Sequence, residues 1–228
     1  MYKNCYAERA GYNKYKIHLW EDSGYQQLEW QNQAYTECHE HDSTIMGING
    51  EPLKRVYKWE RGDTKLHFHD MPAHQKFLIE KYGIDDTPST THREMFFDIE
   101  IEMGGALTPE YIKSAPKPVT SIAWYDKQVD KWGIIILDTK KTLKHYHAKN
   151  KEIIPVDTEE ELLAKFLERL REIAPDILVG YNSDYFDVPY LYYRMCNVLG
   201  EDMAAFLSPI GKVKERINFQ TGEIWSPD

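Results

Sequence analysis

The chain has 228 residues, enough for one large domain or two small ones, and its 42% hydrophobic and 13% aromatic content indicates a folded protein. The formal net charge of −9 argues against a basic surface that grips a nucleic-acid backbone, but it leaves binding through metal ions open. The three cysteines are unclustered, which argues against a disulfide framework and favours a reducing compartment. Since no apolar run approaches the roughly 18 residues that span a bilayer, we expect a cytoplasmic protein without a membrane partner.

Residues 1–93 form the first predicted unit, which we expect to be a small, mostly β domain. The elements expected in it are strands at 14–22 and 54–60 and a helix at 72–83. The polar, proline-containing stretch 85–94 has no periodicity and is typical of a linker.

Residues 94–228 form the second predicted unit, which has an α/β pattern. The elements expected in it are strands at 95–102, 119–126, 131–138 and 177–181 and helices at 157–176 and 187–200. We expect the strands at 119–126 and 131–138 to form a hairpin, and the strand at 177–181 to be buried. The stretch 104–118 is predicted to be a loop rich in Gly and Pro, and a final hairpin is predicted about Thr221-Gly222. The fold class is therefore α/β, with a mixed sheet flanked by helices.

The strand in "MFFDIEIEMGG" (95–105) places acids on one face. In it apolar residues alternate with acidic ones, namely Phe97, Ile99 and Ile101 with Asp98, Glu100 and Glu102. Like charges along one strand face repel each other, and Asp and Glu are poor strand formers. Two interpretations stay open at this point: the acids hold cations, or they are a solvated face that guards against edge pairing.

A second acid follows the strand at 177–181. The chain turns at Asn182, and a helix begins near Asp187. An acid at a helix N-terminus often only caps the helix and interacts with its dipole, so this position alone does not indicate catalysis.

Taken together, the two segments resemble a known family. A D-x-E on the first strand of an α/β unit, followed after a later strand by N-x-x-x-F-D, resembles the 3′→5′ exonuclease domains of family B DNA polymerases. The residues that carry this resemblance are Asp98, Glu100, Asn182, Phe186 and Asp187, the last three within "GYNSDYFDVPYL". The resemblance covers about residues 94–228 and implies a ribonuclease-H-like fold. Residues 1–93 are similar only in general plan to the N-terminal domain of phage-type members.

The resemblance implies a two-metal site for hydrolysis of phosphodiesters at a single-stranded 3′ end, as in proofreading during replication. Two Mg²⁺ or Mn²⁺ ions would be held by oxygen ligands. Asp98 would bridge both ions, Glu100 would hold the ion on the nucleophile side, and Asp187 the ion on the leaving-group side. Asn182 would orient the loop or the DNA substrate, and Phe186 would pack beneath the site. Glu102 is set aside as a solvated strand end.

The family's third motif, Y-x-x-x-D, has no suitable match in the chain, and the polymerase palm motifs are absent. The resemblance therefore implies the N-terminal part of a replicative polymerase, with an exonuclease fold that is incomplete at its C-terminal end. We expect the isolated chain to be weak or inactive as a nuclease. Its expected partners are primer-template DNA and a C-terminal polymerase half or subunit. The alternative is a non-catalytic scaffold that binds template or another subunit.

A group of potential zinc ligands lies in the first unit, namely Cys38, His39, His41, His67 and His69. Alternation of the H-x-H type also arises on one face of a strand, so partly exposed strand histidines are the other interpretation.

Overall fold

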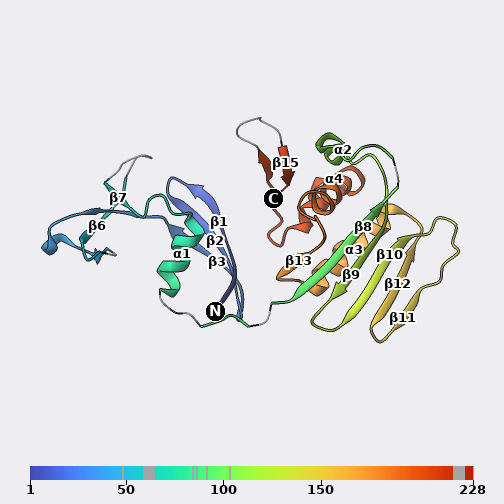
Figure 1. The fold of residues 1–228 in the computed structure, drawn as a ribbon, viewed down its shortest axis with the longest axis horizontal. Coiled ribbons are helices and arrows are strands. Elements are labelled where there is room, and N and C mark those ends of the chain that lie inside the picture. The colour runs from blue at the N-terminus through green and yellow to red at the C-terminus, as the bar shows by residue number, and fades with distance from the viewer. Residues whose placement is uncertain are drawn as a thin grey trace. The chain divides into compact units, whose positions relative to one another are not determined.

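The structure is a computed structural model that describes residues 1–47, 49–58, 65–83, 85, 87–90, 92–102, 104–217 and 224–227. The chain divides into two compact units, Met1–Thr91 and His92–Asp228. Figure 1 shows strands and the helix α1 in the first unit and a larger sheet with helices in the second. Within the described residues, no helix is long and apolar enough to span a membrane.

The first unit contains two antiparallel sheets. One has the order β1-β2-β3, and the other has the order β5-β6-β4-β7. The strands are β1 (Tyr2–Gly11), β2 (Lys14–Glu21), β3 (Gly24–Gln31), β4 (Ala34–Glu37), β5 (Ile45–Met46), β6 (Pro52–Val56) and β7 (Leu66–His67). The helices are the short 3-10 helix η1 (Glu40–Asp42) and α1 (Ala73–Tyr82). Buried Ile17 and Leu19 of β2 pack with Phe77 of α1, which forms the small core of this unit.

The predicted strand at 14–22 and helix at 72–83 are confirmed as β2 and α1. The predicted strand at 54–60 overlaps β6, although residues 59 and 60 lie outside the described part of the chain. Gly83 ends α1 with a positive φ of 59°, a conformation that glycine adopts without a Cβ clash.

The second unit is built on a six-stranded mixed sheet with the order β11-β12-β10-β9-β8-β13. Its strands are β8 (Glu94–Ile101), β9 (Val119–Asp126), β10 (Lys131–Leu137), β11 (Tyr146–Ala148), β12 (Lys151–Val156) and β13 (Ile177–Val179). The predicted hairpin is confirmed, because β9 and β10 pair antiparallel. The pairs β13–β8 and β10–β12 are parallel.

Helices cover one face of this sheet. They are α2 (Pro109–Ser114), α3 (Glu159–Ile173), α4 (Asp187–Leu199), α5 (Glu201–Ala204) and the 3-10 helix η2 (Ala205–Leu207). The two long predicted helices are confirmed as α3 and α4. The hydroxyl of Thr158 accepts a hydrogen bond from the Glu161 N–H at 3.2 Å and thereby caps α3.

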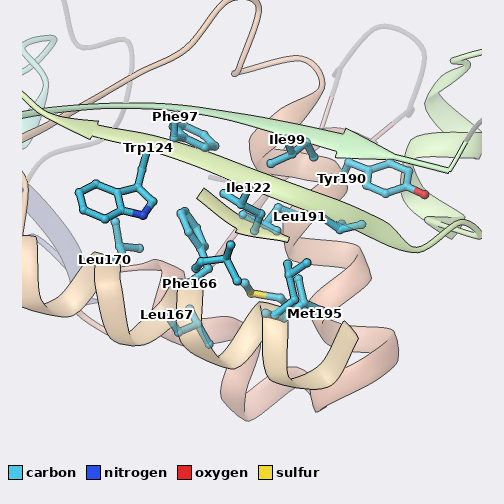
Figure 2. Close-up of a cluster of buried hydrophobic side chains, with 14 of the residues drawn as sticks. Phe97, Ile99, Ile122, Trp124, Phe166, Leu167, Leu170, Tyr190, Leu191 and Met195 are labelled. Carbon is cyan, nitrogen blue, oxygen red and sulfur yellow. The ribbon is translucent and has the colours of Figure 1, made fainter. Parts of the chain in front are cut away.

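The core lies between the sheet and α3 and α4. Figure 2 shows Phe97, Ile99, Ile122 and Trp124 of the sheet beside residues of both helices. The helix residues labelled there are Phe166, Leu167 and Leu170 of α3 and Tyr190, Leu191 and Met195 of α4. All ten side chains are buried, so this packing is the main stabilising contact of the second unit.

Two details of the prediction are wrong, and a third is untested. The strand β13 is not buried, because it forms one edge of the sheet, and Ile177 and Leu178 are 43% and 41% exposed. The stretch 104–118 is not only a loop, because Thr108 accepts a hydrogen bond from the Tyr111 N–H and begins α2. At the C-terminal end, β14 (Glu215–Ile217) and β15 (Ile224–Pro227) pair antiparallel, but the predicted turn at Thr221-Gly222 lies outside the described residues.

Candidate active site

The strand β8 presents its acids on the face opposite the core. Phe97 and Ile99 are only 5% exposed, whereas Asp98 and Glu100 are exposed. Because side chains of a strand alternate between its two faces, packing of Phe97 and Ile99 into the core directs Asp98 and Glu100 to the opposite face. The predicted alternation is confirmed.

The turn after β13 brings a second segment to this strand. Gly180 lies so close to β8 that a Cβ at this position would be 3.0 Å from the Phe97 carbonyl oxygen. Asn182 follows with a φ of +56°, a left-handed conformation that Asn tolerates better than most residues. Its carbonyl accepts hydrogen bonds from the N–H groups of Tyr185 and Phe186, which close the turn before α4 begins.

Asp187 at the start of α4 is anchored directly to the acidic strand. Its side chain is buried, at 3% exposed, and its Oδ1 accepts a hydrogen bond from the Ile99 N–H at 3.2 Å. The register of β13 on β8 ends at Val179 opposite Phe96, so no rung of β13 reaches Ile99. The Asp187 carboxylate therefore accepts the hydrogen bond that a further residue of β13 would otherwise accept. It lies beside Ile99, the residue between Asp98 and Glu100.

The Asp187 carboxyl responds to its burial and to the charges of the two acids on β8. Burial raises the pKa of the Asp187 carboxyl above its ordinary value, and the neighbouring charges of Asp98 and Glu100 raise it further. The hydrogen bond from Ile99 acts in the opposite direction, because it favours the ionised form. The structure thus brings the three predicted acids into one electrostatic neighbourhood.

The helix that carries Asp187 is held firmly at its other turns. The Tyr190 hydroxyl donates to the Lys117 carbonyl at 2.7 Å and accepts from the Lys117 N–H at 3.0 Å. The Arg194 guanidinium binds both carboxylate oxygens of Glu159, at 2.8 and 2.6 Å, and donates to the Ala115 carbonyl at 3.0 Å. These contacts tie α4 to the start of α3 and to the end of α2, so the position of Asp187 does not depend on one hydrogen bond.

The donor set suits a hard divalent cation in chemistry and charge. Three carboxylates supply oxygen ligands. A cation among them would offset the burial of the Asp187 charge and its repulsion by Asp98 and Glu100, which raise the pKa of Asp187. Their arrangement is less complete. Among the described residues, no group of three or more His, Cys, Asp or Glu side chains is arranged ready to hold a metal ion.

The two other predicted site residues, Asn182 and Phe186, differ in their exposure. Asn182 is exposed in its turn, and Phe186 packs against the core, with its ring centroid 5.5 Å from that of Tyr190. Glu102, which was set aside, follows β8 and forms an exposed ion pair with Lys117 at 3.6 Å.

A pocket lies beside Asp98 that the sequence patterns do not predict. Its volume is about 460 Å³, and its lining includes Phe96, Tyr125, Trp132 and the highly exposed Tyr181. The alternation of β9 and β10 predicts which residues share a face, but not that aromatic residues of three strands stand in register. The pairing of the strands was needed to find them.

The five potential zinc ligands do not come together. The rings of His39 and His41 are stacked at 5.6 Å, the Cys38 thiol donates to the Pro52 carbonyl, and His67 lies between Glu37 and Glu51. The part of the chain that the structure describes contains no metal-binding group at these positions.

Comparison with known proteins agrees with the resemblance to family B DNA polymerases. The family model described as "DNA polymerase family B, exonuclease domain" matches residues 69–224, a match that begins in the first unit and extends through the second. The DNA-directed DNA polymerase of Escherichia phage RB69 is 27% identical over 229 residues, which cover 84% of this chain and 25% of that protein.

Two further relatives match shorter parts of the chain. A DNA polymerase of Pyrococcus glycovorans is 30% identical over 126 residues, which cover 55% of this chain and 14% of the relative. The DNA-directed DNA polymerase of Enterobacteria phage T4 is 35% identical over 78 residues, which cover 33% and 9%. The chain thus spans a quarter or less of the length of these polymerases. Because the family model matches more than half of its residues, the chain belongs to the family of exonuclease domains found in family B DNA polymerases.

Proposed function

We propose that the chain carries the 3′→5′ proofreading exonuclease site of a family B DNA polymerase and removes nucleotides from single-stranded 3′ ends during replication. In this proposal residues 94–228 are an exonuclease domain of ribonuclease-H-like type, and residues 1–93 are the N-terminal domain that precedes it. The observation that carries the proposal is the hydrogen bond of Asp187 to Ile99, which unites the two acidic motifs at one point of β8.

The proposed roles follow from where each carboxylate lies. Asp98 and Glu100 would hold divalent cations from the exposed face of β8, and Asp187 would hold them from the first residue of α4. Mg²⁺ or Mn²⁺ ions at this site would supply a nucleophilic water and stabilise the charge that develops on phosphorus and on the leaving 3′ oxygen. The positive end of the α4 dipole and the Ile99 N–H both favour the ionised form of Asp187, which is the form that binds a cation.

The surroundings of the site also support roles for two residues of the turn. Asn182 is exposed and held in a left-handed conformation, so its amide can contact a nucleotide or orient the loop. Phe186 supports the site from beneath through its contact with Tyr190.

The test is a hydrolysis assay with single-stranded DNA labelled at its 5′ end, at high protein concentration and in Mn²⁺. We expect slow removal of nucleotides from the 3′ end, loss of this activity on addition of EDTA, and loss in Asp98→Ala. Glu102→Gln is the matched control, because this acid lies outside β8 and pairs with Lys117. Cleavage inside the strand, or equal activity in Asp98→Ala and the wild-type chain, would refute the proposal.

A non-catalytic scaffold is the second candidate. One observation favours it, since the described residues contain no ready group of three metal ligands. If the wild-type chain neither hydrolyses DNA nor binds Mn²⁺, the scaffold is the better account.

A further inference from the structure

A line of side chains crosses the sheet face that carries Asp98. In the register of the sheet, Phe96 of β8 lies opposite Tyr125 of β9, Tyr125 opposite Trp132 of β10, and Trp132 opposite Lys151 of β12. Residues in register on neighbouring strands point to the same face. The three aromatic residues, Phe96, Tyr125 and Trp132, are called the aromatic row below.

The rings of neighbouring residues in the aromatic row contact each other, and the two outer residues are exposed whereas Tyr125 is half-buried. The ring centroids of Tyr125 and Trp132 are 4.0 Å apart at an interplanar angle of 22°, and those of Phe96 and Tyr125 are 6.0 Å apart. Phe96 and Trp132 are 37% and 51% exposed. Two strand spacings separate Phe96 from Trp132, so the row is about 10 Å long.

The aromatic row and Asp98 line the same pocket, of about 460 Å³. Asp98 lies two residues after Phe96 on β8, on the same face, and is opposite Ala123 of β9. Because the Ala123 side chain is small, it leaves space between the Asp98 carboxylate and the aromatic rings. A ligand held on the row therefore reaches the carboxylate directly.

We propose that the aromatic row is a stacking platform for the bases of single-stranded DNA whose 3′ end lies at Asp98. This inference rests on the proposed exonuclease function and specifies how its substrate is held. Every base has a π-face, so aromatic stacking holds single strands without sequence preference, and it does not need a basic surface. Such binding suits a chain whose net charge is −9. The exposed Lys151 at the end of the row is positioned to meet a phosphate.

A protein segment is the competing occupant of this face, because Ile134 and Ile153 continue it beyond the row. Two features favour DNA at the row itself. Burying the Asp98 carboxylate under an apolar protein surface would cost desolvation energy, whereas a nucleotide with its cations remains polar around it. Apart from Ala123 and Val179, the apolar side chains that line the pocket with Asp98 are also aromatic rather than aliphatic.

The test measures the affinity of the full chain for a short oligothymidylate labelled with fluorescein, by fluorescence anisotropy. Ca²⁺ replaces Mg²⁺ or Mn²⁺, so that binding is measured without relying on hydrolysis. Trp132→Ala and Phe96→Ala should each raise Kd by between about fivefold and a hundredfold, because one stacked base is lost. Trp132→Phe should keep most of the affinity. Phe206→Ala is the matched control, since Phe206 is 41% exposed but packs on Arg171 of α3.

Each other outcome overturns the platform. One such outcome is a wild-type chain that does not bind the oligothymidylate. Another is a Kd for Trp132→Ala and Phe96→Ala that equals the Kd of Phe206→Ala. If Trp132→Ala instead makes a self-associating chain monomeric in light scattering while Kd stays constant, the face binds protein and not DNA. The nuclease assay with Asp98→Ala keeps the two proposals apart. Hydrolysis that requires Asp98 but not the aromatic row would refute only the platform. DNA binding that requires the row, together with hydrolysis that does not require Asp98, would refute only the exonuclease.

Discussion

Replacement of Asp187 tests whether its carboxylate is anchored to β8, and whether burial and the neighbouring acids destabilise its ionised form. We compare Asp187→Asn with Asp187→Ala in EDTA at neutral pH. Asn keeps an oxygen that can accept from the Ile99 N–H, whereas Ala leaves this buried donor without its 3.2 Å partner. An unsatisfied buried N–H costs about 1–3 kcal/mol, so the alanine variant should be less stable than the asparagine variant by that amount.

The difference in the free energy of unfolding between Asp187→Asn and the wild-type chain depends on pH. Because the pKa of Asp187 is raised in the folded chain, the folded chain binds this proton more tightly than the unfolded chain does. The stability contributed by the proton is fully present below the ordinary value of 3.8 and is lost as the pH rises through the raised pKa. At neutral pH Asp187→Asn should therefore have a larger free energy of unfolding than the wild-type chain, and this gain should shrink on acidification.

The assay is urea denaturation monitored by tryptophan fluorescence at several pH values. Asp184→Asn is the control, because Asp184 is an exposed acid of the same turn and its replacement should change stability by less than about 0.5 kcal/mol. A wild-type chain that is more stable than Asp187→Asn in EDTA would refute the conclusion that burial and the neighbouring acids destabilise the ionised Asp187 carboxylate. Equal stabilities of the alanine and asparagine variants would refute the anchoring hydrogen bond.

Three further replacements test how single elements of the two units are stabilised, each by urea denaturation. Arg194→Met leaves the Glu159 carboxylate, 12% exposed, without its cation and should lower the free energy of unfolding by about 3–5 kcal/mol. Lys165→Met, at the exposed pair with Glu161, should lower it by less than about 1 kcal/mol. Similar losses of stability in the two variants would contradict the importance of the buried pair. Thr158→Ala removes the cap of α3 and should cost about 1 kcal/mol, while Thr158→Ser should cost little. In the first unit, burial lowers the pKa of Lys76 to about 8, so Lys76→Met should stabilise this unit near pH 7 by as much as about 3 kcal/mol. That gain should vanish above the ordinary pKa of 10.5, and a constant gain across the range would show that packing, not charge, is responsible.

Sequence periodicity predicted the elements that have a strong pattern of their own. The alternation in β8, the hairpin of β9 and β10 and the amphipathic α3 all follow from local patterns and are confirmed. The two acidic motifs also identified the family, because their residue types, spacing and order together are more specific than either motif alone.

The predictions fail where the surroundings of a residue depend on the position of its strand in the sheet and not on the local sequence pattern. The run Ile177-Leu178-Val179 indicates a strand, but nothing within it says that this strand lies at an edge. The same limitation hid the aromatic row, because Phe96, Tyr125 and Trp132 are brought together only by the register of three strands. The anchoring of Asp187 by a backbone N–H of β8 could not be predicted either, since it depends on where β13 ends.

The central claim is that carboxylates from β8 and α4 share divalent cations. Titration calorimetry with Mn²⁺ tests it most directly, with Asp98→Ala and Asp187→Ala as the variants and Glu102→Ala as the control. We predict that the wild-type chain and Glu102→Ala bind Mn²⁺ and that both other variants lose this binding. Mn²⁺ binding that is the same in all four proteins, or absent from the wild-type chain, would contradict the shared site.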